Sequence, residues 1–272
     1  KTTTLKVLAG LLLPSGGDVS VDGVDMSESP IGIRSRIGFL PEDPPLYQEM
    51  TARDFLRFVG ALRGMSPSSI EDRLDDVLSR TNLNEVADRV ISEISHGFKK
   101  RVGIASAIIH SPKLVILDEP ISGLDPVQIV EIRKVIRALK EDCTVLLSSH
   151  ILSEISQTCD RILVLNQGRL VAQGTETEIA GRFHIGGSVD LGPRGDATTI
   201  RSIIEAQSGV KKLIELSAGE GVCTVRVSMA DDVREALVSA LVGAGIGICS
   251  VTDAHDELEG IFLGLIDNGG EA

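Results

Sequence analysis

The chain has 272 residues, of which 42% are hydrophobic and only 3% aromatic, and it contains no tryptophan. Its 39 acidic and 27 basic residues give a formal net charge of −12, which repels phosphate backbones and argues against nucleic acid as a partner. The four cysteines lack C-x-x-C spacing, so we expect buried thiols rather than a metal site or disulfide framework. The longest nearly apolar stretch, 241–251, is far shorter than the ~20 residues of a membrane-spanning helix.

Helical and strand patterns alternate along the first two thirds of the chain. Apolar residues at helical spacing predict helices, and short apolar or alternating runs predict strands. In chain order we expect a helix at 2–12, strands at 18–23 and 37–40, helices at 51–63, 66–81 and 97–110, a strand at 114–117, a helix at 126–140, a strand at 144–148, a helix at 151–158 and a strand at 161–165. This order indicates an α/β fold around a core of buried parallel strands.

The composition changes near residues 182–188, where the letters HIGGS are typical of a linker. Beyond it we expect, in chain order, a strand at 189–191, a helix at 197–207, strands at 212–216 and 223–227, a helix at 231–241, a strand at 247–251 and a helix at 256–266. The order βαββαβ favours a small ferredoxin-like α+β sandwich, and an irregular α+β cap is the alternative. Two domains are therefore expected, at 1–182 and 183–272.

The first residues, Lys1 and Thr2, match the last two positions of the phosphate-binding loop G-x-x-x-x-G-K followed by Ser or Thr. On that interpretation the glycine-rich half of the loop lies upstream of the printed sequence. Lys1 would then neutralise the β- and γ-phosphates of a nucleotide, Thr2 would hold Mg²⁺, and Thr3 would add a further contact.

Two carboxylates follow the apolar run of LVILDEP, at Asp118 and Glu119. In open α/β sheets, ligands bind at the carboxyl ends of the strands. Adjacent acids at that edge need a positive partner, which Mg²⁺ bound to a nucleotide supplies. We expect Asp118 to hold Mg²⁺ through water and Glu119 to orient and deprotonate the attacking water. The alternative is a polar strand exit that caps the next helix.

His150 follows the next apolar strand and reaches the same edge if the strands are parallel. A histidine there can hydrogen-bond the γ-phosphate and the attacking water, although a lone histidine is more often structural. Between the two strands lies the turn SGLDP, whose Asp125 either caps the following helix or takes part in the site.

Together these motifs resemble the ATP-binding subunit of an ABC transporter. KTTT resembles the end of its Walker A loop, LVILDEP its Walker B strand with the catalytic glutamate, SGLDP its D-loop and SSH its switch-histidine loop. In EISHGFKKR, Ser95 and Gly97 stand at the serine and second glycine of the LSGGQ signature. The motifs occur in the family's order from residue 1 to about residue 181.

The resemblance implies a P-loop NTPase fold with a helical subdomain at about 49–111, followed by the small accessory domain. It also implies that two such subunits, as a homodimer or a paired ATPase, sandwich two ATP molecules with Mg²⁺. Each nucleotide then lies between one subunit's P-loop and the other's Ser95 and Gly97, with Asp125 nearby. The start of the signature helix suits this role, because helix N-termini bind anions.

The chain departs from the family pattern at several positions. His96 replaces the first glycine of the signature, and Phe98, Lys99 and Lys100 stand at the glutamine-like positions after it. In GFLPEDPPLY, Glu42 stands where the family commonly has a glutamine that contacts Mg²⁺ and couples to the membrane partner. A glutamate can still coordinate Mg²⁺, but it adds negative charge beside the phosphates.

The GFLPE segment and the ending LEGIFLGL, residues 258–265, resemble the ATPases of ABC-2-type exporters. This implies a peripheral protein on the cytoplasmic face of the cell membrane, which couples ATP hydrolysis to export through a separate permease. One alternative is a nucleic-acid- or translation-linked ABC ATPase, for which basic patches are expected. The other is a non-hydrolysing regulatory subunit, which the altered signature favours and which Glu119 and His150 oppose.

Overall fold

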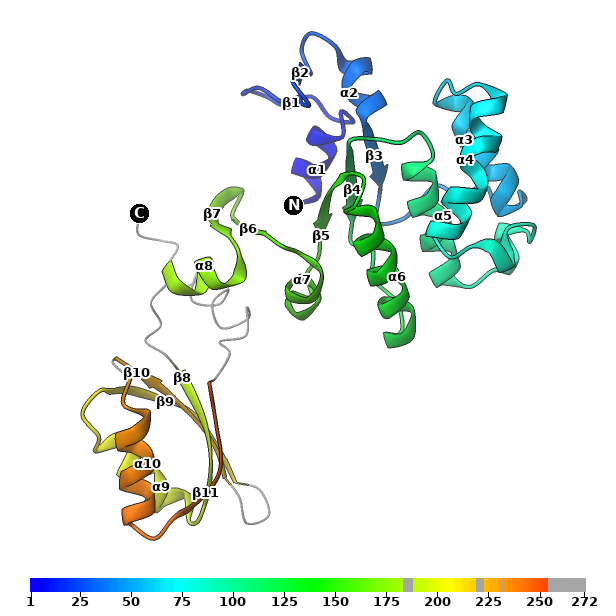
Figure 1. Ribbon diagram of the computed structural model, residues 1–272. Helices are drawn as coiled ribbons and strands as arrows, with labels where there is room; N and C mark the ends of the chain where they lie inside the picture. Colours follow the sequence, from blue (N-terminus) through cyan, green and yellow to red (C-terminus); the bar gives the residue numbers. More distant parts are fainter. Residues whose placement is uncertain (183–187, 219–222, 231, 254–272) are drawn as a thin grey trace. The chain divides into compact units, whose positions relative to one another are not determined.

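The computed structural model describes residues 1–182, 188–218, 223–230 and 232–253 (Figure 1). The chain divides into two compact units, Lys1–Glu154 and Ile155–Ala272, and we describe each by itself. The predicted domain boundary between 182 and 183 stays a prediction. The predicted linker residues 183–187 and the predicted helix at 256–266 lie outside the described residues.

The first unit is built on a parallel three-stranded sheet, which confirms the predicted α/β class. Its strands, in the order in which they pair, are β3 (Ile37–Leu40), β4 (Leu114–Asp118) and β5 (Thr144–Ser148). The register places Leu40 opposite Leu117 and Asp118 opposite Ser148. All three strands therefore end at the same edge.

Helices cover both faces of this sheet. They are α1 (Thr2–Leu8), which contacts β4, α2 (Pro30–Arg36), which contacts β3, and α6 (Pro126–Leu139), which contacts β5. Side chains of β4 alternate between two hydrophobic cores. Ile116 joins the core beneath α1 and α2, whereas Val115 and Leu117 join the larger core that continues into the helical part of the unit.

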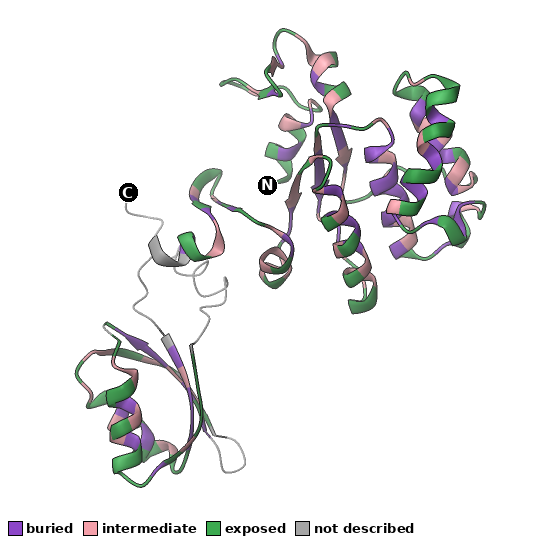
Figure 2. Cartoon of the chain, in the orientation of Figure 1, coloured by how far each residue is buried: buried purple, intermediate pink, exposed green. Residues whose placement is uncertain are grey.

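The remaining helices of the first unit form a helical subdomain beside the sheet (Figure 1). They are α3 (Ala52–Leu62), α4 (Pro67–Arg80) and α5 (His96–Ile108), with 3₁₀ turns at Asn84–Val86 and Ile91–Glu93. Each helix begins at a hydroxyl cap, because the side chains of Thr51, Ser66 and Ser95 accept a hydrogen bond from the N–H three residues later. Figure 2 shows that their buried faces point inward.

Two predictions near the start of the chain differ from the structure, and one helix there was not predicted. The predicted helix at 2–12 ends at Leu8, because Gly10 takes a φ of 69° that no helix continues. The predicted strand at 18–23 is a hairpin of β1 (Ser20–Val21) and β2 (Val24–Asp25). Its turn residues Asp22 and Gly23 both have positive φ, the geometry of a two-residue hairpin turn. Helix α2 was not predicted from the sequence pattern.

In the second unit, the predicted strand at 161–165 is not part of a parallel sheet. It forms β6 (Ile162–Asn166), which pairs antiparallel with β7 (Arg169–Gly174). Gln167 and Gly168 join the two strands with φ angles of 47° and 78°, again a hairpin turn. Two helices flank this hairpin in the sequence, α7 (Leu152–Thr158), which contains the unit boundary, and α8 (Glu176–Arg182).

The rest of the second unit confirms the predicted ferredoxin-like sandwich. Its elements are β8 (Ser188–Arg194), α9 (Ala197–Glu205), β9 (Val210–Ala218), β10 (Cys223–Met229), α10 (Arg234–Gly243) and β11 (Gly247–Asp253). The strands pair in the order β11-β8-β10-β9, and every pair is antiparallel. This is the order of a split βαβ unit. Residues Val189, Leu191, Val225, Val227 and Leu237 are among the buried side chains that join sheet and helices.

Candidate active site at the carboxyl edge of the parallel sheet

Strand β4 ends in Asp118, whose side chain is buried beside Ser148 of β5. The hydroxyl Oγ of Ser148 donates a hydrogen bond of 2.6 Å to Asp118 Oδ1 and accepts one of 3.0 Å from the backbone N–H of Glu119. Asp118 is 1% exposed and Ser148 is 7% exposed. One hydroxyl therefore holds both residues of the acidic pair at the edge of the sheet.

Glu119 has a left-handed backbone with a φ of 49°. A residue other than glycine pays roughly 1–3 kcal/mol for such a conformation, which persists where its surroundings hold it and often marks a functional site. The Ser148 hydroxyl holds the backbone, and His150 holds the side chain, because His150 Nδ1 lies 2.8 Å from Glu119 Oε2. His150 is 62% exposed and Glu119 only 14% exposed, so the pair faces solvent through the histidine.

The first residues of the chain lie at the same edge. Lys1 Nζ donates a hydrogen bond of 3.0 Å to the carbonyl oxygen of Ser149, and Thr2 Oγ1 lies 3.5 Å from Asp118 Oδ1. Thr3 is exposed in the first turn of α1. The structure therefore brings Lys1 and Thr2 together with the carboxylates of β4, although 116 residues separate Thr2 from Asp118.

The oxygen atoms at this edge suit Mg²⁺. The Thr2 hydroxyl and the Asp118 carboxylate are hard ligands close to one another, and Mg²⁺ is commonly held by one or two carboxylates together with substrate phosphates. Among the described residues, no group of three or more His, Cys, Asp or Glu side chains is arranged to hold a metal ion. The donors present fit an ion that is shared with a nucleotide.

Glu42 lies just beyond β3, which ends at the same edge of the sheet as β4. Its side chain is exposed, and its backbone carbonyl oxygen accepts a hydrogen bond from Lys100 Nζ. Lys100 belongs to α5 and is 2% exposed. Burial lowers the pKa of this lysine, whereas the carboxylates of Asp43 and Glu42 favour its charged form.

The signature residues and Asp125 lie at the starts of two helices. Ser95 Oγ accepts a hydrogen bond of 3.4 Å from the N–H of Phe98 and caps α5, and Asp125 Oδ1 accepts one of 2.9 Å from the N–H of Gln128 and caps α6. A Cβ on Gly97 would lie 2.8 Å from the Gln128 side chain, so the two helix starts approach closely. In the described part of the chain, no hydrogen bond links Ser95, Gly97 or Asp125 to the acidic pair.

Sequence reasoning missed two residues of this site. Ser148 is the last residue of an apolar strand, and its contact with Asp118 depends on the register between two strands. Lys100 had a signal in the sequence, because it is a charged residue in a helix of mostly small and apolar residues. That signal did not indicate which segment its ammonium group contacts.

The family model described as "ABC transporter" matches residues 1–122. The bacitracin transport ATP-binding protein BcrA of Enterococcus faecalis is 33% identical over all of this chain and 85% of its own length. The lantibiotic transport ATP-binding protein SrtF of Streptococcus pyogenes is 37% identical over 64% of this chain and 73% of its own. An ABC transporter ATP-binding protein of Bacillus subtilis, YxlF, is 38% identical over 66% of this chain, which spans 59% of that relative.

Solved structures agree with these sequence matches. A structure described as the ATP binding subunit of an ABC transporter has a TM-score of 0.60 and 34% identity, and the match covers 67% of this chain and 77% of that one. CbiO1 of Clostridium perfringens, described as part of the ABC transporter complex cbiONQ, has a TM-score of 0.60 and 28% identity over 75% and 78% of the two chains. The chain therefore belongs to the ATP-binding proteins of ABC transporters, the ATPase subunits that drive transport.

Proposed function

We propose that this chain binds ATP with Mg²⁺ at the edge formed by Lys1, Thr2 and Asp118, and that Glu119 and His150 carry out hydrolysis there. The observation that carries the proposal is the hydrogen-bonded chain from Asp118 through Ser148 to Glu119 and His150. It presents a buried carboxylate for a cation and a second carboxylate, oriented by a histidine, for water.

Each residue has a defined task in this proposal. The ammonium group of Lys1 neutralises charge on the β- and γ-phosphates. Thr2 and Asp118, with Glu42 at the neighbouring strand end, hold the Mg²⁺, which supplies positive charge that stabilises the transferring phosphoryl group. Glu119 accepts the proton of the attacking water, and Thr3 adds a contact near the phosphates.

His150 orients Glu119 through the contact from its Nδ1. The other ring nitrogen, Nε2, is then free to face the terminal phosphate and to sense whether it is present. Groups held in place in this way raise the rate of hydrolysis, because phosphoryl transfer depends on positioning and on charge stabilisation more than on covalent chemistry.

We propose that Ser95, Gly97 and Asp125 act on a nucleotide held by a second subunit, either another copy of this chain or a paired ATPase. The support is that these residues cap α5 and α6 rather than contacting the acidic pair. Closure of the two subunits around ATP then assembles two complete sites. In this proposal residues 1–182 form the ATP-binding domain and residues 183–272 form an accessory domain.

The proposed membrane partner is a separate permease of the ABC-2 type, and the proposed direction of transport is export. BcrA and SrtF are named for bacitracin and lantibiotic transport, and LnrL of Bacillus subtilis, 29% identical over 97% of this chain, is named for linearmycin resistance. None of the helices in the described residues is long and apolar enough to cross a membrane. We place the protein at the cytoplasmic face of the cell membrane.

The Glu119→Gln variant tests the proposed chemistry. The amide keeps the size of the side chain but cannot accept the proton, and positioned general bases contribute about 10²–10⁴-fold to rates. We therefore expect the full-length protein to lose ATP hydrolysis by about 100-fold or more, with nucleotide binding retained. Steady-state phosphate release and nucleotide titration measure the two quantities.

Two results would contradict this assignment. Equal hydrolysis by wild type and Glu119→Gln would remove Glu119 from the reaction. Binding of ATP without hydrolysis by either protein would favour the non-hydrolysing regulatory subunit.

A further inference from the structure

Two departures from the family pattern meet in this structure. Glu42 adds a carboxylate at the end of β3, and Lys100 adds an ammonium group in the signature helix α5. The chain positions are 58 residues apart, yet Lys100 Nζ donates a hydrogen bond to the carbonyl oxygen of Glu42. A new negative charge and a new positive charge therefore occupy neighbouring positions.

The environment of Lys100 is acidic as well as buried. Glu42, Asp43, Asp118 and Glu119 each favour its protonated form electrostatically, and burial alone opposes it. Long charged side chains are almost never fully buried unless they are paired. Two of these carboxylates belong to the segment after β3, and the other two lie at the end of β4. The ammonium group of Lys100 is therefore close to the carboxyl ends of both strands.

Backbone packing shows that α5 and this segment approach closely. On Gly103, one turn along α5 from Lys100, a Cβ would lie 2.5 Å from Leu40 Cδ1 and 3.0 Å from Pro44 Cβ. Residues three apart share a helix face, so the contacts at Lys100 and Gly103 hold the same segment. The neighbouring Arg101 contacts a different region, since it donates to the Asn82 carbonyl oxygen and lies over the Phe98 ring.

We propose that Lys100 is a positioning residue, whose ammonium group holds segment 41–46 against the signature helix and compensates the carboxylate that Glu42 adds beside the nucleotide. The compensation rests on the function proposed above, whereas the holding of the segment does not. A shift of α5 then displaces Glu42 as well, because the hydrogen bond from Lys100 Nζ to the Glu42 carbonyl oxygen links the two directly. The parallel sheet need not move.

Hydrogen–deuterium exchange of the nucleotide-free, full-length protein tests the holding role. Lys100→Met keeps the length of the side chain and removes the ammonium group. Loss of a hydrogen bond from a charged donor corresponds to about tenfold in an opening equilibrium, so peptides that cover 41–50 should exchange about tenfold faster. Lys99→Met is the matched control, because Lys99 donates to the Ser92 carbonyl oxygen on another side of the helix.

The extent of the effect along the chain separates a positioning role from a merely structural one. Removing one partner of a buried charged contact destabilises the folded state, so the midpoint of urea unfolding should fall in Lys100→Met. A merely structural role would accelerate exchange throughout the unit, whereas the holding role accelerates peptides that cover 41–50 more than peptides of β4 and β5. Unchanged exchange at 41–50, or equal acceleration by Lys99→Met, would overturn the proposal. These measurements need no ATPase activity, so they stand even if the proposed function fails.

A double-mutant cycle in ATP hydrolysis tests the compensation. Lys100→Met should lower kcat/KM about tenfold, because an unbalanced Glu42 carboxylate then faces the phosphates. Adding Glu42→Gln to that variant removes the excess charge and should restore at least half of the loss on a logarithmic scale. Additive effects of the two substitutions would show that the charges act independently and would overturn the compensation.

Discussion

At the residue scale, the hydroxyl of Ser148 organises the proposed catalytic edge. It donates to a carboxylate and accepts from the N–H of a residue in a left-handed conformation. Glu119 takes this conformation immediately before a proline, which cannot donate a hydrogen bond itself. The Ser148 hydroxyl therefore offsets part of the backbone strain and aims the Glu119 carboxylate toward His150.

Replacing Ser148 tests this role. Ser148→Ala removes both hydrogen bonds, and we expect kcat for ATP hydrolysis to fall about tenfold, which corresponds to roughly 1.4 kcal/mol. Ser148→Thr keeps the hydroxyl and should retain most of the activity. Equal activity of wild type and Ser148→Ala would show that the hydroxyl has no positioning role.

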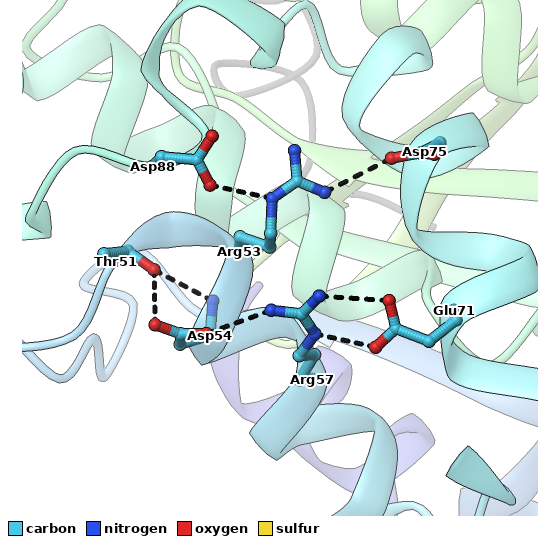
Figure 3. A network of polar contacts seen from close by, with 7 residues as sticks. All are labelled: Thr51, Arg53, Asp54, Arg57, Glu71, Asp75 and Asp88. Atoms are coloured by element: carbon cyan, nitrogen blue, oxygen red, sulfur yellow. Dashed lines mark hydrogen bonds and ion pairs between the residues drawn. The ribbon is translucent and has the colours of Figure 1, made fainter. Parts of the chain in front are cut away.

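At the element scale, α3 and α4 are joined by an exposed network of charges (Figure 3). Arg57 contacts Glu71 through two hydrogen bonds of 2.7 and 3.0 Å, and Arg53 contacts Asp75 and Asp88. The hydrogen bond with Glu71 raises the pKa of Arg57. Solvent screens exposed pairs of this kind, so we assign the stability of the helical subdomain to the apolar side chains beneath the network.

Two substitutions in these helices compare the contribution of the buried apolar side chains to stability with that of the exposed ion pairs. Leu74 of α4 is 1% exposed in the larger core, and Leu74→Ala should lower the free energy of unfolding by about 2–5 kcal/mol. Arg57→Ala should change it little, and that small change should vanish in high salt. Urea unfolding can be followed by the fluorescence of Tyr47, the single tyrosine, which packs edge-on against Phe58. If Arg57→Ala lowered the free energy of unfolding more than Leu74→Ala, the assignment of stability to the apolar side chains would be wrong.

At the scale of the whole molecule, two hydrophobic cores lie in the first unit and one in the second, and a polar junction in the first unit joins two helices to β3. His110, just beyond α5, lies with Nε2 3.1 Å from the Ile37 carbonyl oxygen, and Arg63, just beyond α3, donates to the carbonyl oxygens of Arg34 and Ile37. Both helices are thereby joined to the start of β3. Burial, assisted by Arg63, lowers the pKa of His110 to about 4.

This junction predicts a loss of stability in acid. The ordinary pKa of a histidine is near 6.5, so the unfolded chain takes up a proton as the pH falls below that value, whereas folded His110 does so only near pH 4. The free energy of unfolding should therefore decrease as the pH falls through this window. Urea unfolding at pH 7 and pH 5, followed by Tyr47 fluorescence, should show a smaller decrease for His110→Gln than for wild type. An equal decrease in both proteins would exclude His110 as the source.

Much of the fold followed from local patterns. The strands at 37–40, 114–117 and 144–148 and the helices from 51 to 140 were predicted because apolar spacing and capping residues are properties of neighbouring positions. The βαββαβ order of the second unit was predicted for the same reason. The error at 161–165 arose because an apolar run does not specify its partner. The hairpin turn at Gln167 and Gly168 was the overlooked signal.

The sequence by itself determined the kinds of elements, their order and the carboxylates at the end of β4, because an apolar run followed by charged residues is a local pattern. The tertiary structure alone decided which groups those carboxylates meet. Ser148 reaches Asp118 through the register of two parallel strands, and Lys100 reaches Glu42 through the packing of α5 on a segment 58 residues away. Such contacts depend on how distant segments bury their surfaces against one another, and no short stretch of sequence contains that information.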